Sequence, residues 1–220
     1  MELYIVRHGQ SQANVGMPIL DAHLTQLGLR QADLLGQEFA DIHFDRILAS
    51  TLARTAQTAA GIAAYQSPDT VIELVPELVE ADTPADFEGD RAFLQSVYPR
   101  VRADRMQACA FDDDHARARY VLEEYVFGPA YAQGFDVERS DREGIVMRER
   151  QQNLLIVTHC VFIAHLLSHL VGFPFDPNMV VSLSNTGVSR LALYTINGMR
   201  RIKFKSFNET RHLPKDALSS

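Results

Sequence analysis

Continuous apolar runs alternate along the chain with segments in which apolar side chains recur every three or four positions. The continuous runs predict buried strands over residues 3–6, 46–50, 70–75 and 153–158. The helical spacing predicts helices over residues 24–40, 51–65 and 161–172, the first with Thr25 as its N-cap. Near the end of the chain, 187–197 and 201–207 predict a strand pair that turns at Asn197-Gly198.

Strands that alternate with helices predict a three-layer α/β/α sandwich, in which helices cover both faces of a mostly parallel central sheet. Residues 84–150 break this alternation, since they carry three consecutive aspartates, many arginines and no clean strand. We therefore expect a single domain over residues 1–220 with a mostly helical, cap-like insertion at about 84–150.

Composition narrows the class of protein. The 220 residues are 46% hydrophobic and 22% charged, which is typical of a soluble globular domain. The net charge of −7 argues against binding to nucleic acid or to an anionic membrane, because both need a positive face. No export signal, membrane-length apolar run or Cys-x-x-Cys pair is visible, so we expect a cytoplasmic protein.

Candidate chemistry lies where two of the predicted strands end. The first strand leads into Arg7-His8-Gly9, and the strand over 153–158 leads into His159. Ligands of open α/β sheets bind beyond the carboxyl ends of the strands, so these side chains are expected at one functional edge. One histidine at such a place would be weak support, whereas two at equivalent strand ends are stronger.

A third element points to the same edge. The strand over 46–50 ends at Ser50, a good N-cap for the following helix, and Arg54 lies within the first turn of that helix. Helix N-termini and guanidinium groups both attract phosphate and carboxylate. The residues therefore predict an anion site.

The chain resembles the histidine phosphatase superfamily, the phosphoglycerate mutase-like proteins, in an ordered series of motifs. The hallmark Arg-His-Gly is followed by Gln10 and Asn14, and further matches run from Leu24 to Leu213. They are Leu24, Thr25, Gly28 and Gln31, SxxxRxxxTA at 50–59, LVE at 78–80, FEG at 87–89, VTH at 157–159, SNTG at 184–187 and NETRHL at 208–213.

The resemblance implies a mechanism and a set of roles. His8 would be the nucleophile that forms a phosphohistidine, and Arg7, Arg54 and His159 would bind the phosphoryl oxygens with help from Asn14. Glu80 would be the general acid and then the base, so the catalytic group comprises His8, Glu80 and His159. The implied enzyme is a metal-independent phosphatase without a cofactor, acting on a small phosphomonoester.

Several residues have simpler interpretations. Glu73, Glu77 and Glu88 compete with Glu80 for the acid role, with Glu88 interpreted as structural or gating. His165 and His169 follow His159 at roughly helical spacing, but no carboxylate has a ligand's spacing and no metal site is predicted.

Two other nucleophile patterns fit poorly. Ser11 in GQSQA resembles a nucleophile elbow, but it follows the first strand instead of lying well inside the chain. Neither Cys109 nor Cys160 has the arginine six residues on that a cysteine phosphatase needs. Cys160 instead follows His159 where the family commonly has glycine, so a narrower phosphate pocket is one expected consequence.

Two alternative functions stay open at this point. A phosphoglycerate-type mutase is disfavoured because the chain has no tryptophan, and a non-catalytic module that binds phosphorylated ligands would not need a nucleophile. The insertion carries arginines that either bind a second anionic group of the substrate or lie on solvated helix faces: Arg100, Arg102, Arg105, Arg117 and Arg119. The C-terminal strand pair either ends the sheet or pairs across a homodimer.

Overall fold

A seven-stranded sheet forms the centre of the protein, which we describe from a computed structural model. Its strands lie in the order β4, β3, β2, β7, β1, β8, β9. Their bounds are β1 Glu2–Arg7, β2 Arg46–Ala49, β3 Ile72–Leu74, β4 Val101–Arg102, β7 Asn153–Thr158, β8 Val188–Ile196 and β9 Met199–Glu209. The strands from β4 to β1 are parallel, and β8 and β9 add to β1 in antiparallel fashion. The structure describes residues 1–17, 19–81, 83–84, 86–102, 111, 113–128, 137–139, 145–147, 152–172, 181–196 and 199–220.

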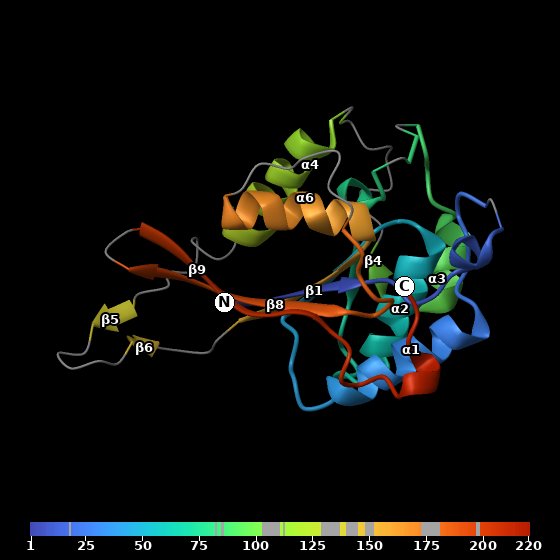
Figure 1. Cartoon of the computed structure of the whole chain (residues 1–220), viewed down its shortest axis with the longest axis horizontal. Helices are drawn as coiled ribbons and strands as arrows, with labels where there is room; N and C mark the ends of the chain where they lie inside the picture. The colour runs from blue at the N-terminus through green and yellow to red at the C-terminus, as the bar shows by residue number, and fades with distance from the viewer. Residues whose placement is uncertain are drawn as a thin grey trace.

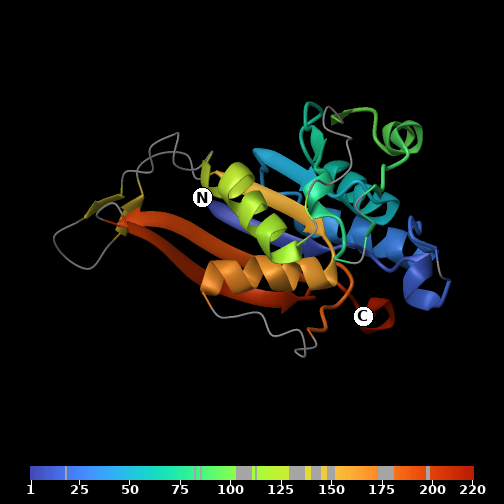
Figure 2. The ribbon, with the colours of Figure 1, turned by 90° about the horizontal axis from the view of Figure 1, so that it is seen from above.

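Helices cover both faces of the sheet. Helices α1 (Gln26–Glu38) and α2 (Ala53–Ala63) lie on one face, and α4 (Asp114–Val121) and α6 (Cys160–Val171) lie on the other (Figure 1). Seen from above, α4 and α6 lie side by side across the strands (Figure 2). The predicted three-layer α/β sandwich with a mostly parallel sheet is therefore confirmed. Across the described ranges, no helix has the length and apolar character needed to cross a bilayer.

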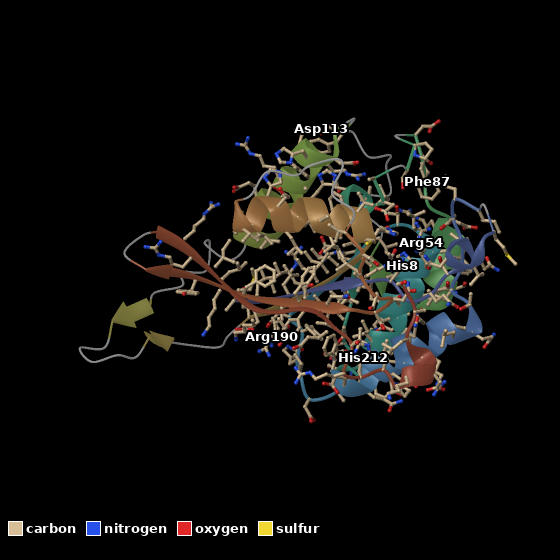
Figure 3. All side chains as sticks on the ribbon, in the orientation of Figure 1. His8, Arg54, Phe87, Asp113, Arg190 and His212 are labelled. Atoms are coloured by element: carbon tan, nitrogen blue, oxygen red, sulfur yellow. The ribbon has the colours of Figure 1, made fainter. Side chains whose placement is uncertain are left out.

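The alternation of side chains along the central strands creates two cores. Leu3 and Ile5 of β1 pack with Phe162 of α6, whereas Tyr4 and Val6 pack in the cluster that includes Leu35 of α1. Because successive strand side chains point to opposite faces, a strand with no polar interruption supplies both layers. Side chains fill the space between the sheet and both helix layers (Figure 3). The apolar runs of the sequence are thus the strands buried on both faces.

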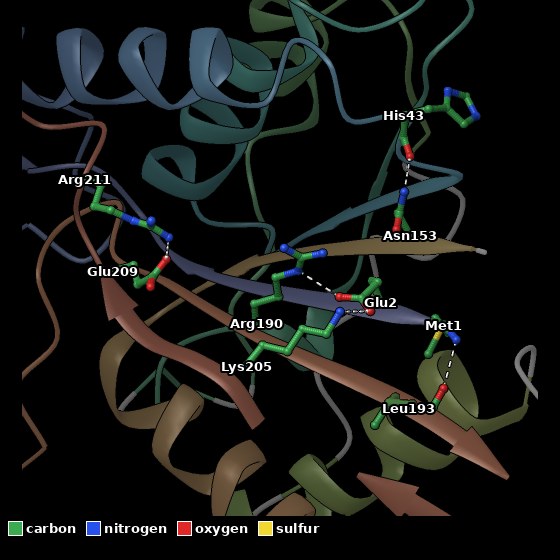
Figure 4. A network of polar contacts seen from close by, with 9 residues as sticks. All are labelled: Met1, Glu2, His43, Asn153, Arg190, Leu193, Lys205, Glu209 and Arg211. Carbon is green, nitrogen blue, oxygen red and sulfur yellow. Dashed lines mark hydrogen bonds and ion pairs between the residues drawn. The ribbon is translucent and has the colours of Figure 1, made fainter. Parts of the chain in front are cut away.

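Glu2 ties β1 to the two antiparallel strands at the end distant from the predicted anion site. Its buried carboxylate accepts hydrogen bonds from Arg190 Nε of β8 at 2.8 Å and from Lys205 Nζ of β9 at 2.5 Å (Figure 4). The amino group of Met1 donates to the carbonyl oxygen of Leu193 at 2.9 Å. A buried charge needs such partners, so these contacts fix the register of all three strands.

The described residues of the insertion over 84–150 form both helices and short strands. It contains α3 (Arg91–Val97), α4 and the π-helical turn η3 (Leu122–Phe127), but also β4 and a hairpin of β5 (Val137–Arg139) and β6 (Ile145–Met147). The expectation of no strand there is wrong. β4 is two residues long and is defined by its pairing with β3, so no local pattern reveals it.

Three further predictions about the chain lie beyond what the structure describes. The predicted turn at Asn197-Gly198 lies outside the described residues, although Ile196 and Met199 pair on either side of it. β9 is the edge strand of the sheet, so the strand pair ends the sheet. The single domain over 1–220 and the pairing of this edge across a homodimer stay predictions.

Gly28 of α1 allows the helix to touch the segment that follows β1. A Cβ atom at this position would lie 2.0 Å from the backbone carbonyl oxygen of Gln10.

We expect Gly28→Ala to lower the free energy of unfolding by about 1 to 3 kcal/mol, because the backbone must move. Chemical denaturation measures this change. Leu29→Ala, at an exposed position of the same helix, is the control, and equal losses in both variants would contradict the explanation.

Candidate active site

His8 is held at the carboxyl end of β1 in one tautomer. Its backbone N–H donates to the carbonyl oxygen of Thr158 at 3.0 Å, which ties it to β7. The ring Nδ1 lies 2.7 Å from the carbonyl oxygen of Gly9. Because a carbonyl oxygen only accepts, Nδ1 carries the proton and Nε2 keeps its lone pair. The unprotonated nitrogen of His8 is therefore Nε2.

The backbone around His8 is fixed by a second layer of contacts. Asn185 Nδ2 donates to the carbonyl oxygen of His8 at 3.1 Å, and Gly9 N–H donates to Thr58 Oγ1 at 3.0 Å. The N–H of Thr186 is shared between the carbonyl oxygens of Arg7 and His8 at 3.1 and 3.3 Å. Thr186 adopts a φ of 54°, which is uncommon for a β-branched residue and costs conformational energy. The surrounding contacts hold it there.

His159 lies next to His8. It follows β7, precedes α6, and its ring centroid is 5.1 Å from that of His8 with the planes inclined by 59°. Its Nε2 is 2.9 Å from Ser50 Oγ. Its buried Nδ1 has no hydrogen-bond partner among the residues that the structure describes. A buried polar atom that lacks a hydrogen-bond partner indicates a ligand that forms the missing hydrogen bond.

Arg7 and Arg54 bring two buried guanidinium groups to the same place. Arg54 Nη1 donates to the carbonyl oxygen of Leu20 at 3.0 Å, and Arg7 Nη1 donates to that of Leu183. Burial lowers the pKa of both side chains, and Glu80 partly opposes this for both by its negative charge. Arg7 Nε has no hydrogen-bond partner within the described part of the chain. Uncompensated positive charge at the end of the sheet favours an anion.

The two arginines and the burial together keep both imidazoles neutral. Burial is the main reason why the pKa of His8 lies well below its usual value, and the positive charges of Arg54 and Arg7 lower it further. The pKa of His159 is also well below its usual value, through burial first and then through Arg54. Both rings are therefore neutral near pH 7, each with a proton on one of its two nitrogens.

Glu80 lies beside this group and behaves differently from an exposed carboxylate. It follows the short 3-10 helix η2 (Pro76–Leu78), and its Oε1 accepts hydrogen bonds from the N–H of Ala81 at 3.0 Å and of Phe162 at 3.3 Å. Burial raises the pKa of Glu80, while these two bonds and the charges of Arg54 and Arg7 oppose the rise. Asp82, another carboxylate close by in the sequence, lies outside the described residues.

The competing carboxylates are placed elsewhere. Glu73 on β3 pairs with Arg46 at 3.0 Å and with Arg102 at 2.7 Å, Glu77 is buried within η2, and Glu88 is exposed. Only Glu80, among these four, interacts with both Arg7 and Arg54 in the contacts described above.

Asn14 reaches the site from η1 (Gln12–Val15). Its Oδ1 accepts from Ser11 N–H at 2.9 Å and Ser11 Oγ at 3.0 Å, so its amide nitrogen is the atom left to donate to a ligand. Asn185 Nδ2 also approaches Asn14 Oδ1 at 3.5 Å, which links Asn14 to the backbone of His8. Ser11 is completely buried, so it does not stand exposed as a nucleophile elbow requires.

The prediction that Ser50 caps α2 is wrong. The helix begins at Ala53, and its first N–H donates to the side chain of Asp21 at 2.6 Å. Ser50 Oγ instead accepts from Leu52 N–H at 3.1 Å and contacts His159. The cap comes from a residue 32 positions away, which local sequence rules do not detect. Arg54 nevertheless lies in the first turn, as predicted.

The remaining candidates serve other contacts. Cys160 Sγ points to the carbonyl oxygen of Val181 at 3.1 Å. His169 stacks on His115 of α4, with ring centroids 3.9 Å apart, and its Nε2 donates to the carbonyl oxygen of His115. In the described ranges, no group of three or more His, Cys, Asp or Glu side chains is arranged to hold a metal ion.

The predicted site residues therefore meet at one edge of the sheet although they come from distant parts of the sequence. His8 and Arg54 are labelled side by side in Figure 3. Sequence reasoning missed Asp21, the Ser50–His159 contact and the contact of Asn185 with His8. Asn185 lies within the SNTG motif, which was the one available signal for it.

Comparisons with known proteins agree with this geometry. A sequence profile of the histidine phosphatase superfamily (branch 1) matches residues 3–203. The chain is 28% identical over 184 residues to the adenosylcobalamin/alpha-ribazole phosphatase of Escherichia coli (strain K12), covering 80% of this chain and 82% of that protein. It is 26% identical over 194 residues to a probable phosphoglycerate mutase, GpmB, of Proteus mirabilis (strain HI4320), covering 87% and 84%.

Solved structures share the fold. A mycobacterial glucosyl-3-phosphoglycerate phosphatase, in a complex with VO3, superimposes with a TM-score of 0.63. The two chains are 21% identical, and the match covers 95% of this chain and 99% of the other.

The two neutral imidazoles make stability depend on pH. The unfolded chain binds a proton at each histidine near pH 6.5, whereas the folded site does not, so unfolding is favoured as pH falls below that value. Each histidine should contribute on the order of 1 kcal/mol per pH unit to this loss. The raised pKa of Glu80 acts in the opposite direction at lower pH.

We expect His8→Asn to reduce the pH dependence of the free energy of unfolding between pH 7.5 and 5.5. Denaturant titrations at several pH values measure this slope. His43→Asn is the matched control, because more than half of the His43 side chain is exposed. An unchanged slope in His8→Asn would show that His8 is not held neutral by the fold.

Proposed function

The chain belongs to the histidine phosphatase superfamily (branch 1), and from this premise we propose that it hydrolyses small phosphomonoesters through a phosphohistidine on His8. The observation that carries the proposal is the neutral, buried imidazole of His8, whose Nδ1 is bonded to Gly9 and whose Nε2 keeps its lone pair beside two guanidinium groups. Relatives named as phosphatases support the same class of reaction.

In the first step, Nε2 of His8 attacks phosphorus. The P–Nε2 bond forms while the bond between phosphorus and the ester oxygen breaks. A proton on Glu80 passes to the leaving oxygen, so that an alcohol departs and not an alkoxide. A neutral histidine is nucleophilic, and the hydrogen bond from Nδ1 to Gly9 keeps the ring orientation fixed.

In the second step, water attacks the phosphohistidine. Glu80, now a carboxylate, takes a proton from the water, the P–N bond breaks, and the electron pair returns to His8 Nε2. Inorganic phosphate is released and the site returns to its first state. Burial raises the pKa of Glu80, which supports its protonation before the first step.

Arg7, Arg54, His159 and Asn14 would hold the transferred phosphoryl group. Phosphoryl transfer needs positioning and compensation of charge, and guanidinium groups supply charge without titrating. We propose that these side chains do so without a metal ion or another cofactor. Three donors would form hydrogen bonds to the phosphate oxygens: Arg7 Nε, His159 Nδ1 and the amide nitrogen of Asn14.

Ser50 would be a positioning residue for His159. A phosphate oxygen only accepts hydrogen bonds, so His159 must carry its proton on Nδ1 to bind one. Nε2 then accepts, and Ser50 Oγ–H is the donor 2.9 Å away, while Ser50 itself accepts from Leu52. Ser50 would thus select the tautomer of His159 that binds phosphate.

A mutase is the second candidate, because one relative is named as a probable phosphoglycerate mutase. A mutase would keep the phosphoryl group on His8 and return it to a second hydroxyl. A regulatory module that only binds phosphorylated ligands is the third reading. Release of inorganic phosphate supports hydrolysis, whereas transfer between phosphoglycerates without release supports the mutase.

We expect His8→Ala to lower phosphate release at least about 10³-fold, because the covalent route is lost. The assay uses an aryl phosphate and several phosphorylated metabolites with a chelator present. Circular dichroism and thermal unfolding check the fold, and His43→Ala is the control at an exposed histidine. Full activity in His8→Ala would refute the mechanism and favour another nucleophile.

We expect Glu80→Gln to lower kcat for alkyl phosphates by about 10²- to 10³-fold and to affect p-nitrophenyl phosphate much less, since that leaving group needs no proton. The alkaline decrease of kcat for alkyl phosphates should also disappear, because deprotonation of Glu80 removes the acid. Glu88→Gln is the matched control at an exposed glutamate. The acid would be Glu88 if that variant, and not Glu80→Gln, lost alkyl phosphatase activity.

A further inference from the structure

Four apolar side chains stand exposed in a short segment next to Asn14. Val15, Met17, Ile19 and Leu20 are 54%, 50%, 46% and 47% exposed. We call these four residues the apolar rim. Single exposed apolar residues are ordinary, but several close together in a segment mark a binding surface. The phosphate-binding groups proposed above make no use of them.

The apolar rim is attached to the phosphate-binding groups at both ends. Asn14 precedes Val15, and the backbone carbonyl oxygen of Leu20 accepts the hydrogen bond from Arg54 Nη1 at 3.0 Å. Asp21, the next residue, caps the helix that carries Arg54. In Figure 1 this dark blue segment lies at the end of the molecule beyond the carboxyl end of β1. The rim therefore borders the place that a phosphate would occupy.

Backbone hydrogen bonds within the chain organise this segment. The N–H of Met17 donates to the carbonyl oxygen of Gln12 at 3.1 Å, and that of Ile19 donates to Met17 at 2.8 Å. Gly16 turns the chain with a φ of 90° and donates to Ala13. The exposed side chains are thus presented on a formed loop, so a ligand need not order the backbone when it binds.

Three arginines of the insertion are engaged within the fold and do not offer a second anion site. Arg117 is buried, pairs with Asp114 at 2.5 Å and lies over the ring of Phe162. Arg102 pairs with Glu73, and Arg100 lies over the ring of Tyr98. These three guanidinium groups have partners within the fold. The apolar rim therefore remains the exposed feature of this segment that the proposed phosphate site does not use.

We propose that the apolar rim binds the organic group of the substrate, and that the substrate class is phosphomonoesters of apolar alcohols with an aromatic or branched aliphatic group. The proposal rests on the proposed phosphatase function and specifies its substrates. Arg7, Arg54 and His159 hold the phosphate, while Met17, Ile19 and their neighbours cover the apolar group and remove it from water. Esters rich in hydroxyl or charged groups gain nothing from this contact.

The test compares esters whose leaving groups have similar basicity but different apolar area. For the wild type, kcat/KM should rise from glycerol 2-phosphate through butyl phosphate to 2-phenylethyl phosphate. Met17→Ser and Ile19→Ser should each lower kcat/KM for 2-phenylethyl phosphate by about 3- to 10-fold and change that for glycerol 2-phosphate less than about 2-fold. Phe207→Ser is the matched control, since Phe207 is 50% exposed on β9.

A flat series in the wild type, or equal losses for both esters in the rim variants, would overturn the proposal. Failure of the phosphatase function itself is distinguished by a binding measurement that needs no turnover. Calorimetry should give a Kd for 2-phenylethylphosphonate about 10-fold or more below that for methylphosphonate, and Ile19→Ser should reduce this ratio. An equal Kd for both phosphonates would overturn the apolar rim even if the enzyme hydrolyses phosphomonoesters.

Discussion

The burial of two guanidinium groups beside two imidazoles is the constraint on which the rest of this structure depends. Burial lowers the pKa of Arg54 and of His8, and the positive charge of Arg7 lowers both further. Such an arrangement is unfavourable without negative charge, and the fold supplies only part of it through Glu80 and Asp21. In the proposed function a phosphate group would supply the remaining negative charge, so the electrostatic cost of burying the two guanidinium groups would favour its binding.

Much of the fold serves to hold that unfavourable arrangement in place. The backbone of His8 is bonded to Thr158 on one side and to Asn185 and Thr186 on the other. Asn185 in turn contacts Ser219, near the end of the chain, whose Oγ donates to Asn185 Oδ1 at 2.9 Å. Gln31 also donates to Ser219 and accepts from the N–H of Gln10. Ser219, near the C-terminus, is therefore linked through Asn185 to the backbone of His8.

Different side chains of this site would bind the phosphate group and the apolar organic group of a substrate. The phosphate group would be bound by buried cations that every phosphomonoester can use, whereas the apolar rim would distinguish one organic group from another. Both depend on the segment from Asn14 to Asp21, because its backbone contacts Arg54 and its side chains face solvent. A substitution in this segment would therefore alter affinity for phosphate through its backbone contacts and selectivity for the alcohol through its side chains.

Most of the layered fold and the principal site residues could be predicted from the sequence, because their signals are local. The continuous apolar runs define strands buried on both faces, Thr25 caps its helix as expected, and the strand ends identify Arg7, His8 and His159. The motif series and the strand order of an α/β sheet then place Arg54 and Glu80 near them.

Only the tertiary structure decided which side chains complete the site. Ser50 meets His159 across 109 residues, Asn185 meets His8 across 177, and Asp21 caps a helix that begins 32 residues later. β4 exists through its pairing with β3, and Glu80 differs from its neighbouring glutamates through the hydrogen bond that it accepts from the N–H of Phe162 in α6. Local sequence patterns record the conformation of neighbouring residues, whereas these contacts depend on chain segments that meet only after the sheet has formed.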